Sequence, residues 1–312
     1  MEKNKISKES FSIHPGDQEK HEIRNERRRF LKNISALTAA FTVSQAFGSV
    51  RLPSGLMKGT GSSSPAAIHP DKDGVFIISE PEHTPEQIAK AIAEIPKIEY
   101  VPSSERWINL PRTAAALAQD GGELKVVMLG DSIINDTYRS AWYTLLQAQY
   151  PKCKINAVAV VRGSTGCWWY EEKGRIKHYV LPLKPDLLII GGISQKNDIK
   201  AIKKVIHQVR SAQPCDVLLV TNVFGQEDPN NDKQWSFDIP SVPGNYRKGL
   251  LDLSVEAKTG FFDMNAYWGR YMRNSGHPID WFHRDEVHAN LRGEQVIGHL
   301  MAGYLSPATS AG

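Results

Sequence analysis

Apolar and polar positions alternate in blocks along the 312-residue chain, and these blocks predict strands and helices in turn. Continuous apolar runs of strand length predict strands that are buried on both faces. They lie at 124–130, 155–161, 186–192, 216–222 and 260–264. Stretches with helical spacing of their apolar residues predict amphipathic helices. They lie at 138–150, 198–212, 246–258 and 291–305. Strands alternating with helices predict an α/β fold, a three-layer α/β/α sandwich around a central, mostly parallel five-stranded sheet.

Two more helices are predicted ahead of the first strand. Thr84 and Gln87 have the spacing of a capping box, and Pro85 falls at the first helical position, so a helix is expected to begin there. Another helix is expected over 110–119.

The first 48 residues have the pattern of an export signal. The sequence RRRFLK at 27–32 precedes a charge-free, moderately apolar stretch that is short for a permanent membrane helix. This resembles a twin-arginine signal, which implies a periplasmic or secreted protein without a permanent membrane anchor. Residues 49–75 are rich in Gly, Ser and Pro and predict a flexible linker. The folded domain is therefore expected over 76–308.

The charge pattern argues against nucleic acid as a partner. Of the 38 basic and 34 acidic residues, nine and six lie within 1–48, so the remainder is close to neutral. The cysteines show no zinc-binding spacing, and neither a metal nor a cofactor is expected. Cys153, Cys167 and Cys215 allow either one disulfide or buried free thiols.

The sequence Gly-Asp-Ser at 130–132 comes directly after the first predicted strand. Three interpretations are open: Asp131 or Ser132 caps the following helix, the turn binds a phosphate, or Ser132 is a nucleophile. Ligands of open α/β sheets lie beyond the carboxyl ends of the strands, and this turn falls there.

A candidate base with an orienting acid lies near the C-terminus. Asp285 and His288 are three residues apart, so the carboxylate can reach the imidazole Nδ1–H while Nε2 points outward. A serine nucleophile needs this arrangement, because a free hydroxyl reacts poorly. Asp280 and His283 have the same spacing and form a rival pair.

Together these blocks resemble the SGNH (GDSL-type) hydrolase family, and in particular exported bacterial carbohydrate esterases. The sequence GDS, a glycine after the second strand (Gly163 in VVRGSTG) and DEVHANLRG stand in the family's order over 124–304. HANLRG favours His288 over His283 as the base, although Ala289 replaces the family's usual proline. The resemblance implies a flavodoxin-like fold and a serine ester hydrolase. Its implied catalytic residues are Ser132, Asp285 and His288.

The resemblance also implies an oxyanion hole. Its donors would be the N–H groups of Ser132 and Gly163 and a third group after the third strand. The family has GxND there, whereas this chain reads GGISQKND, which places Asn197 three residues late. Three extended residues span about 10 Å. We therefore expect Ser194 or Gln195 to be the donor and Asn197 to cap the next helix, unless a longer loop carries Asn197 back.

Aromatic residues suggest the substrate. Trp168, Trp169 and Tyr170 either stack on sugar rings or pack in the core, and His283 and Arg284 are further candidates for substrate contacts. Long loops at 224–245 and 265–284 are expected to wall the cleft. With export, these features favour an acylated, most simply O-acetylated, carbohydrate. The alternatives are another SGNH activity (thioesterase, lysophospholipase or other glycan-active enzyme) and a non-catalytic glycan-binding domain.

Overall fold

A computed structural model describes residues 70–223 and 227–307. The expected signal and most of the expected linker lie outside these residues. The end of the linker segment does not behave as a free linker. The Asp71 carboxylate accepts the N–H of Val75 at 3.0 Å and the Tyr179 hydroxyl at 2.7 Å, and Val75 is buried. The packed part of the chain therefore starts before residue 76.

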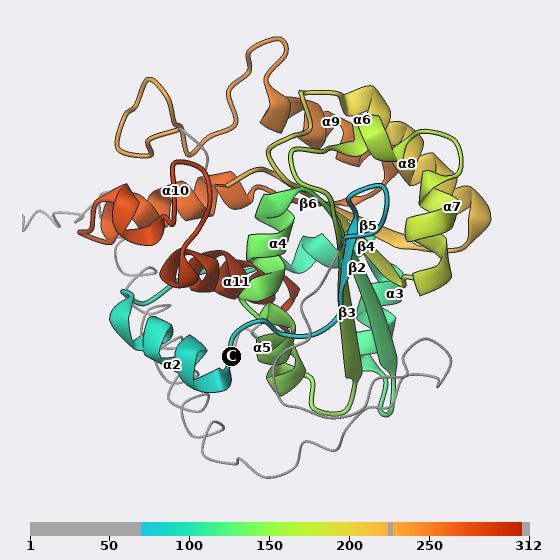
Figure 1. Ribbon diagram of the computed structural model, residues 1–312, viewed down its shortest axis with the longest axis horizontal. Coiled ribbons are helices and arrows are strands. Elements are labelled where there is room, and N and C mark those ends of the chain that lie inside the picture. Colours follow the sequence, from blue (N-terminus) through green and yellow to red (C-terminus); the bar gives the residue numbers. More distant parts are fainter. Residues whose placement is uncertain (1–69, 224–226, 308–312) are drawn as a thin grey trace, which may run out of the picture. The chain divides into compact units, whose positions relative to one another are not determined.

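Six strands form one sheet in the order β1-β3-β2-β4-β5-β6 (Figure 1). Their bounds are β1 Phe76–Ile78, β2 Glu123–Gly130, β3 Lys154–Val161, β4 Leu187–Ile190, β5 Asp216–Val220 and β6 Gly260–Phe262. All neighbours are parallel except β1, which pairs antiparallel with β3. The five predicted strands are confirmed. The short edge strand β1 was not predicted, because three residues cannot establish a period.

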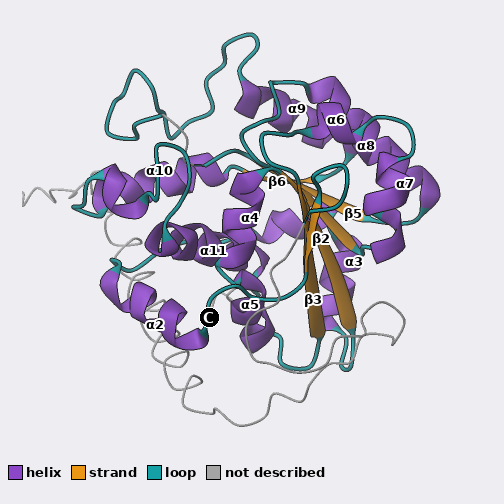
Figure 2. Ribbon diagram, in the orientation of Figure 1, coloured by secondary structure: helices purple, strands orange, loops and turns teal. Residues whose placement is uncertain are grey.

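Helices cover both faces of the sheet (Figure 2). One face carries α4, α5, α10 and α11, and the other carries α6, α7, α8 and α9. The helix bounds are α2 Pro85–Glu94, α3 Pro111–Ala118, α4 Ser132–Arg139, α5 Trp142–Gln149, α6 Cys167–Tyr170, α7 Arg175–Tyr179, α8 Ile199–Ala212, α9 Tyr246–Ala257, α10 Met264–Asn274 and α11 Leu291–Leu305, with 3-10 turns η1 Ser104–Asn109, η2 Leu181–Leu183 and η3 Ile279–Phe282. The three-layer α/β/α prediction is confirmed. None of the helices described here is long and apolar enough to cross a membrane.

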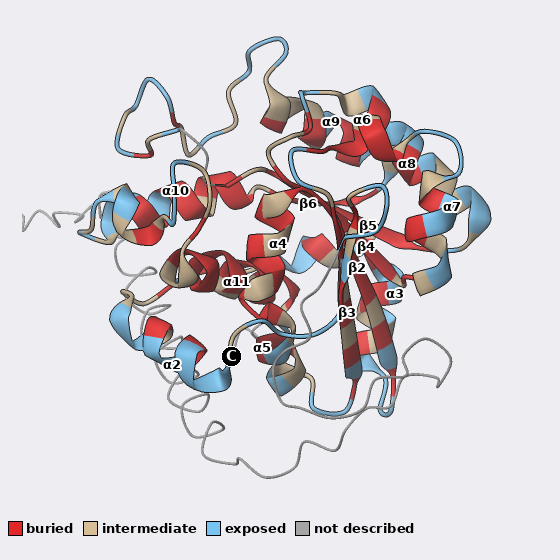
Figure 3. Ribbon diagram, viewed as in Figure 1, coloured by how far each residue is buried: buried red, intermediate tan, exposed pale blue. Residues whose placement is uncertain are grey.

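The apolar runs of the sequence form the middle layer of the sandwich (Figure 3). In β2, Val126 and Met128 pack on one face, and Val127 and Leu129 pack on the other. All four side chains are at most 1% exposed. Because neither face of the strand meets solvent, its sequence cannot alternate between apolar and polar residues.

The helix predicted over 138–150 is wrong at its start. The chain forms α4 immediately after Asp131, breaks at Ser140 and Ala141, and continues as α5. Ala141 has a left-handed φ of 55°. The break lies where α11 crosses closely, since a Cβ built at Gly298 would lie 2.2 Å from Ser140 Oγ. Two helices therefore replace one because of tertiary packing, which local periodicity does not report.

The predicted loop at 265–284 is also wrong. Its first half is the helix α10, in which Trp268 is fully buried and Tyr271 nearly so. Trp235, from the other predicted wall, is buried against Gly269, where a Cβ would lie 2.1 Å from its ring. These aromatic residues belong to the core and do not wall a cleft.

Candidate functional site

The strand order brings three loops together beside Ser132. β2 lies between β3 and β4, and Gly130 is paired with Val161. Ser132 and Gly163 each lie two residues beyond that pair, so they leave the same edge of the sheet on neighbouring strands. On the other side of β2, a Cβ at Gly130 would lie 2.5 Å from the Gly191 carbonyl oxygen. The three sequence blocks therefore meet where the sequence predicted, at the carboxyl edge.

Asp131 joins the Ser132 turn to the loop after β4. Its carboxylate is fully buried and accepts the N–H of Ile133 at 2.9 Å and that of Ser194 at 2.6 Å. Burial raises the pKa of Asp131, and hydrogen bonds from Ser194 and Ile133 oppose that rise. Gly192 is required beside it, because a Cβ there would lie 2.4 Å from Asp131 Oδ1. Asp131 thus caps α4 and holds two loops, and it does not face a substrate.

Ser132, His288 and Asp285 form one hydrogen-bonded chain. His288 Nε2 lies 2.7 Å from Ser132 Oγ, and His288 Nδ1 lies 2.9 Å from both carboxylate oxygens of Asp285. Ser132 is the first residue of α4 and is half-buried. The pair that contacts Ser132 is therefore Asp285–His288 and not the rival pair Asp280–His283.

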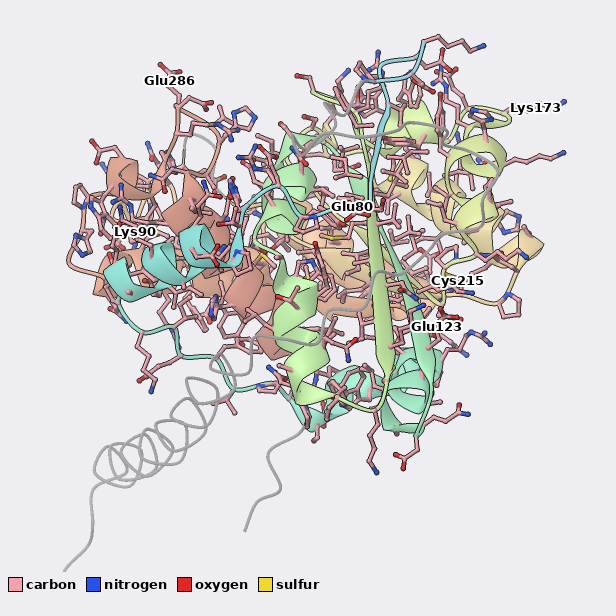
Figure 4. The ribbon with its side chains drawn as sticks, turned by 60° about the horizontal axis from the view of Figure 1, so that its bottom comes forward. Glu80, Lys90, Glu123, Lys173, Cys215 and Glu286 are labelled. Atoms are coloured by element: carbon pink, nitrogen blue, oxygen red, sulfur yellow. The ribbon has the colours of Figure 1, made fainter. Side chains whose placement is uncertain are left out.

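Asp285 is held by the turn between it and His288. Its Oδ1 accepts the backbone N–H groups of Val287 and His288, each at 2.9 Å. The hydrogen bond from Val287 is the largest cause that lowers the pKa of Asp285, to about 2, and the bonds from His288 add to it. The carboxylate therefore stays charged throughout the neutral range. Glu286, at the tip of this turn, points away from the domain (Figure 4).

His283 has a different place in the same segment. It pairs with Ala289 in an antiparallel β-bridge, which folds the chain back on itself around the Asp285 turn. Its side chain is half-buried, and desolvation is the largest cause that lowers its pKa. Arg284, the other candidate for substrate contacts, is exposed and lies 3.4 Å from Asp136 and 3.8 Å from Asp285.

Asp136 is a residue of this region that the sequence motifs did not indicate. It is fully buried on α4, and its Oδ2 accepts the N–H of Ala289 at 3.0 Å. Burial is the largest cause that raises the pKa of Asp136 to about 6, Arg284 opposes the rise, and Glu294 adds to it. The one available signal was its spacing, four residues after Ser132 on the same face of a helix.

The backbone amides of Ser132 and Gly163 are free to bind an oxyanion. Among the residues that the structure describes, neither N–H donates a hydrogen bond. Gly163 is exposed, and a Cβ there would meet nothing within 4 Å. Its carbonyl accepts the Thr165 hydroxyl at 2.9 Å, which holds the turn from behind.

Ser194 and Gln195 were expected to supply the third hydrogen-bond donor to the oxyanion, and their contacts differ. Gln195 is 1% exposed, and its amide bridges the Gly191 carbonyl at 2.7 Å and the Cys167 N–H at 2.8 Å. The backbone N–H of Ser194 donates to the Asp131 carboxylate at 2.6 Å, and Ser194 is half-buried. The Gln195 amide therefore holds two loops together and is not the third donor, whereas the Ser194 hydroxyl remains the predicted donor.

Asn197 does not cap the following helix. The cap of α8 is Asp198, whose side chain accepts the N–H of Ala201 at 2.9 Å. Asn197 is exposed, has a left-handed φ of 54°, and lines an open cleft of about 340 Å³ with Ile199, residues 241–246, Lys248, Gly249 and Asp252. The extra residues of GGISQKND thus form a tight turn that carries Asn197 to that cleft.

Two of the three predicted sugar-stacking residues are buried. Tyr170 is inaccessible, and Trp169 is 9% exposed between the guanidinium groups of Arg162 and Arg175. The core alternative is correct for both. Trp168 remains half-exposed. Its indole N–H donates to the Ser194 carbonyl at 2.8 Å, which fixes the ring beside the loop after β4.

The remaining chemistry of the described residues is sparse. All three cysteines are buried and free, so the disulfide alternative is wrong. No group of three or more His, Cys, Asp or Glu side chains within 70–223 and 227–307 is arranged to hold a metal ion.

Comparison with family models and with curated proteins gave no match. Several solved structures are similar. A two-domain esterase (CEX) active on acetylated mannans is 17% identical with a TM-score of 0.50, over 66% of this chain and 56% of that one. The acetylxylan esterase Axe2 from Geobacillus stearothermophilus is 17% identical (TM-score 0.47; 60% and 96% covered). A GDSL-like lipase from Parabacteroides merdae is 16% identical (TM-score 0.47; 59% and 98% covered). At these identities the likeness concerns the fold alone, and the chain shares the α/β/α fold of the CEX esterase.

Proposed function

We propose that the protein is a serine-dependent ester hydrolase that removes O-acyl groups, most simply O-acetyl groups, from a carbohydrate. The observation that carries the proposal is the continuous chain from Ser132 Oγ through His288 to Asp285, with distances of 2.7 and 2.9 Å. Both contacts lie within the reach that nucleophile–base and base–acid pairs need.

In the first step, His288 Nε2 takes the proton of the Ser132 hydroxyl as Oγ attacks the ester carbonyl carbon. The carbonyl oxygen becomes an oxyanion in a tetrahedral intermediate. His288 then gives its proton to the alcohol oxygen of the sugar, the ester C–O bond breaks, and an acyl-Ser132 remains. Asp285 holds the imidazole so that Nε2 faces the serine, and its negative charge stabilises the imidazolium.

In the second step, water replaces the sugar. His288 takes a proton from the water, and the resulting oxygen attacks the acyl carbon. Return of that proton to Ser132 Oγ releases the carboxylic acid and restores the enzyme. In both steps the free N–H groups of Ser132 and Gly163 stabilise the oxyanion, and the loss of one such donor typically costs about 3 kcal/mol.

Three features support a carbohydrate substrate. Trp168 is a half-exposed aromatic side chain anchored to the loop after β4. The CEX esterase of the same fold is active on acetylated mannans. The N-terminal sequence resembles a twin-arginine signal, which would bring the enzyme to glycans outside the cytoplasm as a periplasmic or secreted protein.

The decisive experiment is an activity screen on the purified protein and its Ser132→Ala variant. The substrates are acetylated xylan and mannan oligosaccharides, aryl acetates and acyl-thioesters. We expect acetate release from the acetylated glycans by the wild type and none by the variant. Turnover that survives Ser132→Ala would overturn the assignment of Ser132 as the nucleophile. Turnover of thioesters alone would overturn the proposed carbohydrate ester substrate.

A further inference from the structure

We propose that Asp136 is a positioning residue for this reaction. Asp136 lies one helical turn beyond Ser132 and holds the backbone that follows His288. In this way it sets the distance between Ser132 and its base. This inference rests on the proposed function for its kinetic consequence, whereas the geometric role stands on its own.

Asp136 and Ser132 share one rigid element. They are four residues apart on α4, and residues at that spacing lie on the same face of a helix, one turn apart. Asp136 is fully buried, so its side chain has a fixed environment. A group held by Asp136 is therefore placed relative to Ser132 with little freedom.

The group that Asp136 holds is the residue next to the base. Its Oδ2 accepts the N–H of Ala289 at 3.0 Å, and Ala289 is itself fully buried. A buried N–H requires an acceptor. The carboxylate of Asp136 on α4 supplies one to residues 282–290, which we call the His288 segment. A charged acceptor makes this bond stronger than one between neutral groups.

The other hydrogen bonds of this segment fix its shape. Arg284 N–H donates to the His288 carbonyl at 2.9 Å, and Asn290 N–H donates to the Phe282 carbonyl at 2.9 Å. Both bonds connect residues within 282–290, so they do not determine how far His288 lies from α4. The bond from Ala289 to Asp136 does connect the two elements.

Ion pairs around Asp136 strengthen the same link. Arg284, from the His288 segment, reaches Asp136 Oδ1 at 3.4 Å. The buried Glu294 on α11 forms an ion pair with Arg139 of α4, with Arg139 Nε 2.9 Å from Glu294 Oε1, and its Oε2 lies 2.8 Å from His83 Nε2. Arg284 Nη1 also lies 4.0 Å from Glu294. α4, the His288 segment and α11 are thus joined by the alternating charges of Asp136, Arg284, Glu294 and Arg139.

The test compares Asp136→Ala with Asp136→Asn. The asparagine keeps an oxygen that can accept the Ala289 N–H, whereas the alanine leaves that N–H buried without an acceptor. We expect Asp136→Ala to lower kcat by roughly ten- to a hundredfold with KM within about twofold, because a small misplacement of a base is costly. Asp136→Asn should restore kcat to within about threefold of the wild type.

Asp216→Ala is the matched control. Asp216 is also buried and also accepts a backbone N–H, that of Thr113 at 2.8 Å, but it is the first residue of β5, at the opposite edge of the sheet. Its loss should destabilise the fold and leave kcat unchanged.

A second readout does not depend on activity. In protein labelled with ¹⁵N-histidine, the His288 signal is assigned by its loss in His288→Ala. Asp136→Ala should shift this signal as Ser132→Ala does, whereas Asp136→Asn and Asp216→Ala should leave it in place. An unmoved signal together with an unchanged kcat in Asp136→Ala would overturn the positioning role. A wild type inactive on every ester would overturn the proposed function, and the His288 signal would still decide the role of Asp136.

Discussion

The side-chain carbonyl of Gln195 accepts the backbone N–H of Cys167 at 2.8 Å. Together with the bond from the Trp168 indole N–H to the Ser194 carbonyl, it joins the loop after β4 to the loop after β3. The amide nitrogen of Gln195 donates to the Gly191 carbonyl at 2.7 Å. A glycine is required at position 166 for this close approach of the two loops, because a Cβ there would lie 2.7 Å from Gln195 Cα. Two loops from different strands therefore behave as one support beside Ser132.

Gln195→Ala should loosen this support. The Cys167 N–H would be buried without an acceptor, which costs about 1–3 kcal/mol. We expect that loss in the free energy of unfolding by urea titration, with a lower kcat because the Gly163 loop is less well placed. Gln208→Ala is the control, since Gln208 on α8 contacts the Glu171 carbonyl at 2.6 Å from a half-exposed position. Equal stability of the two variants would contradict the role of Gln195.

His288→Ala and His283→Ala should differ strongly in rate. His288 contacts Ser132 Oγ at 2.7 Å, so its loss removes the proton acceptor and should lower kcat by several orders of magnitude. His283 lies in the β-bridge with Ala289, and its alanine variant should keep most of the activity. Initial rates on an aryl acetate distinguish the two, and the reverse ranking would refute the assignment of the base.

Asn197→Gly and Asp198→Ala separate an exposed turn residue from a helix cap. Glycine keeps the left-handed backbone of residue 197 and removes only its side chain. We expect an unchanged kcat, because Asn197 lines a cleft whose lining residues include neither Ser132 nor His288. A hundredfold loss of kcat would show that the Asn197 amide reaches the oxyanion after all. Asp198→Ala should lose about 1 kcal/mol of stability and keep its activity.

The stability of Asp136→Asn relative to the wild type should depend on pH. The pKa of Asp136 is raised from 3.8 to about 6 in the folded protein, so the folded state favours the protonated acid. Its contribution to stability is present below pH 4 and is lost as the pH rises through about 6. Asparagine does not titrate, so the variant should gain about 2 kcal/mol relative to the wild type between pH 4 and pH 7. Urea unfolding across this range measures the change, and a constant difference would argue against a raised pKa.

Much of the fold could be predicted because it follows from local patterns. Strands such as β2 are uninterrupted apolar runs, and the stripe of α8 and the capping box of Thr84 are spaced by helix geometry. What failed depended on distant partners. The left-handed Ala141 is a response to the close approach of α11, and Trp268 is buried by segments remote in sequence.

The candidate site divides in the same way. Ser132, Asp285 and His288 were identified because they lie in two short motifs, GDS and DEVHANLRG, and the structure brings them into contact. Gln195 was misassigned because the sequence shows that an amide is present and does not show what it binds. Asp136 was missed because its significance lies in a contact across 153 residues of sequence.

The three buried, uncrosslinked cysteines imply that the described domain offers a reducing agent no disulfide to cleave. No disulfide among the described residues restricts the conformations of the unfolded chain. The stability of the domain therefore rests on buried apolar surface and hydrogen bonds. Burial also raises the pKa of the Cys215 thiol to about 12, which leaves almost no thiolate for exchange or oxidation at neutral pH. A reducing agent should therefore leave the free energy of unfolding of the described domain unchanged.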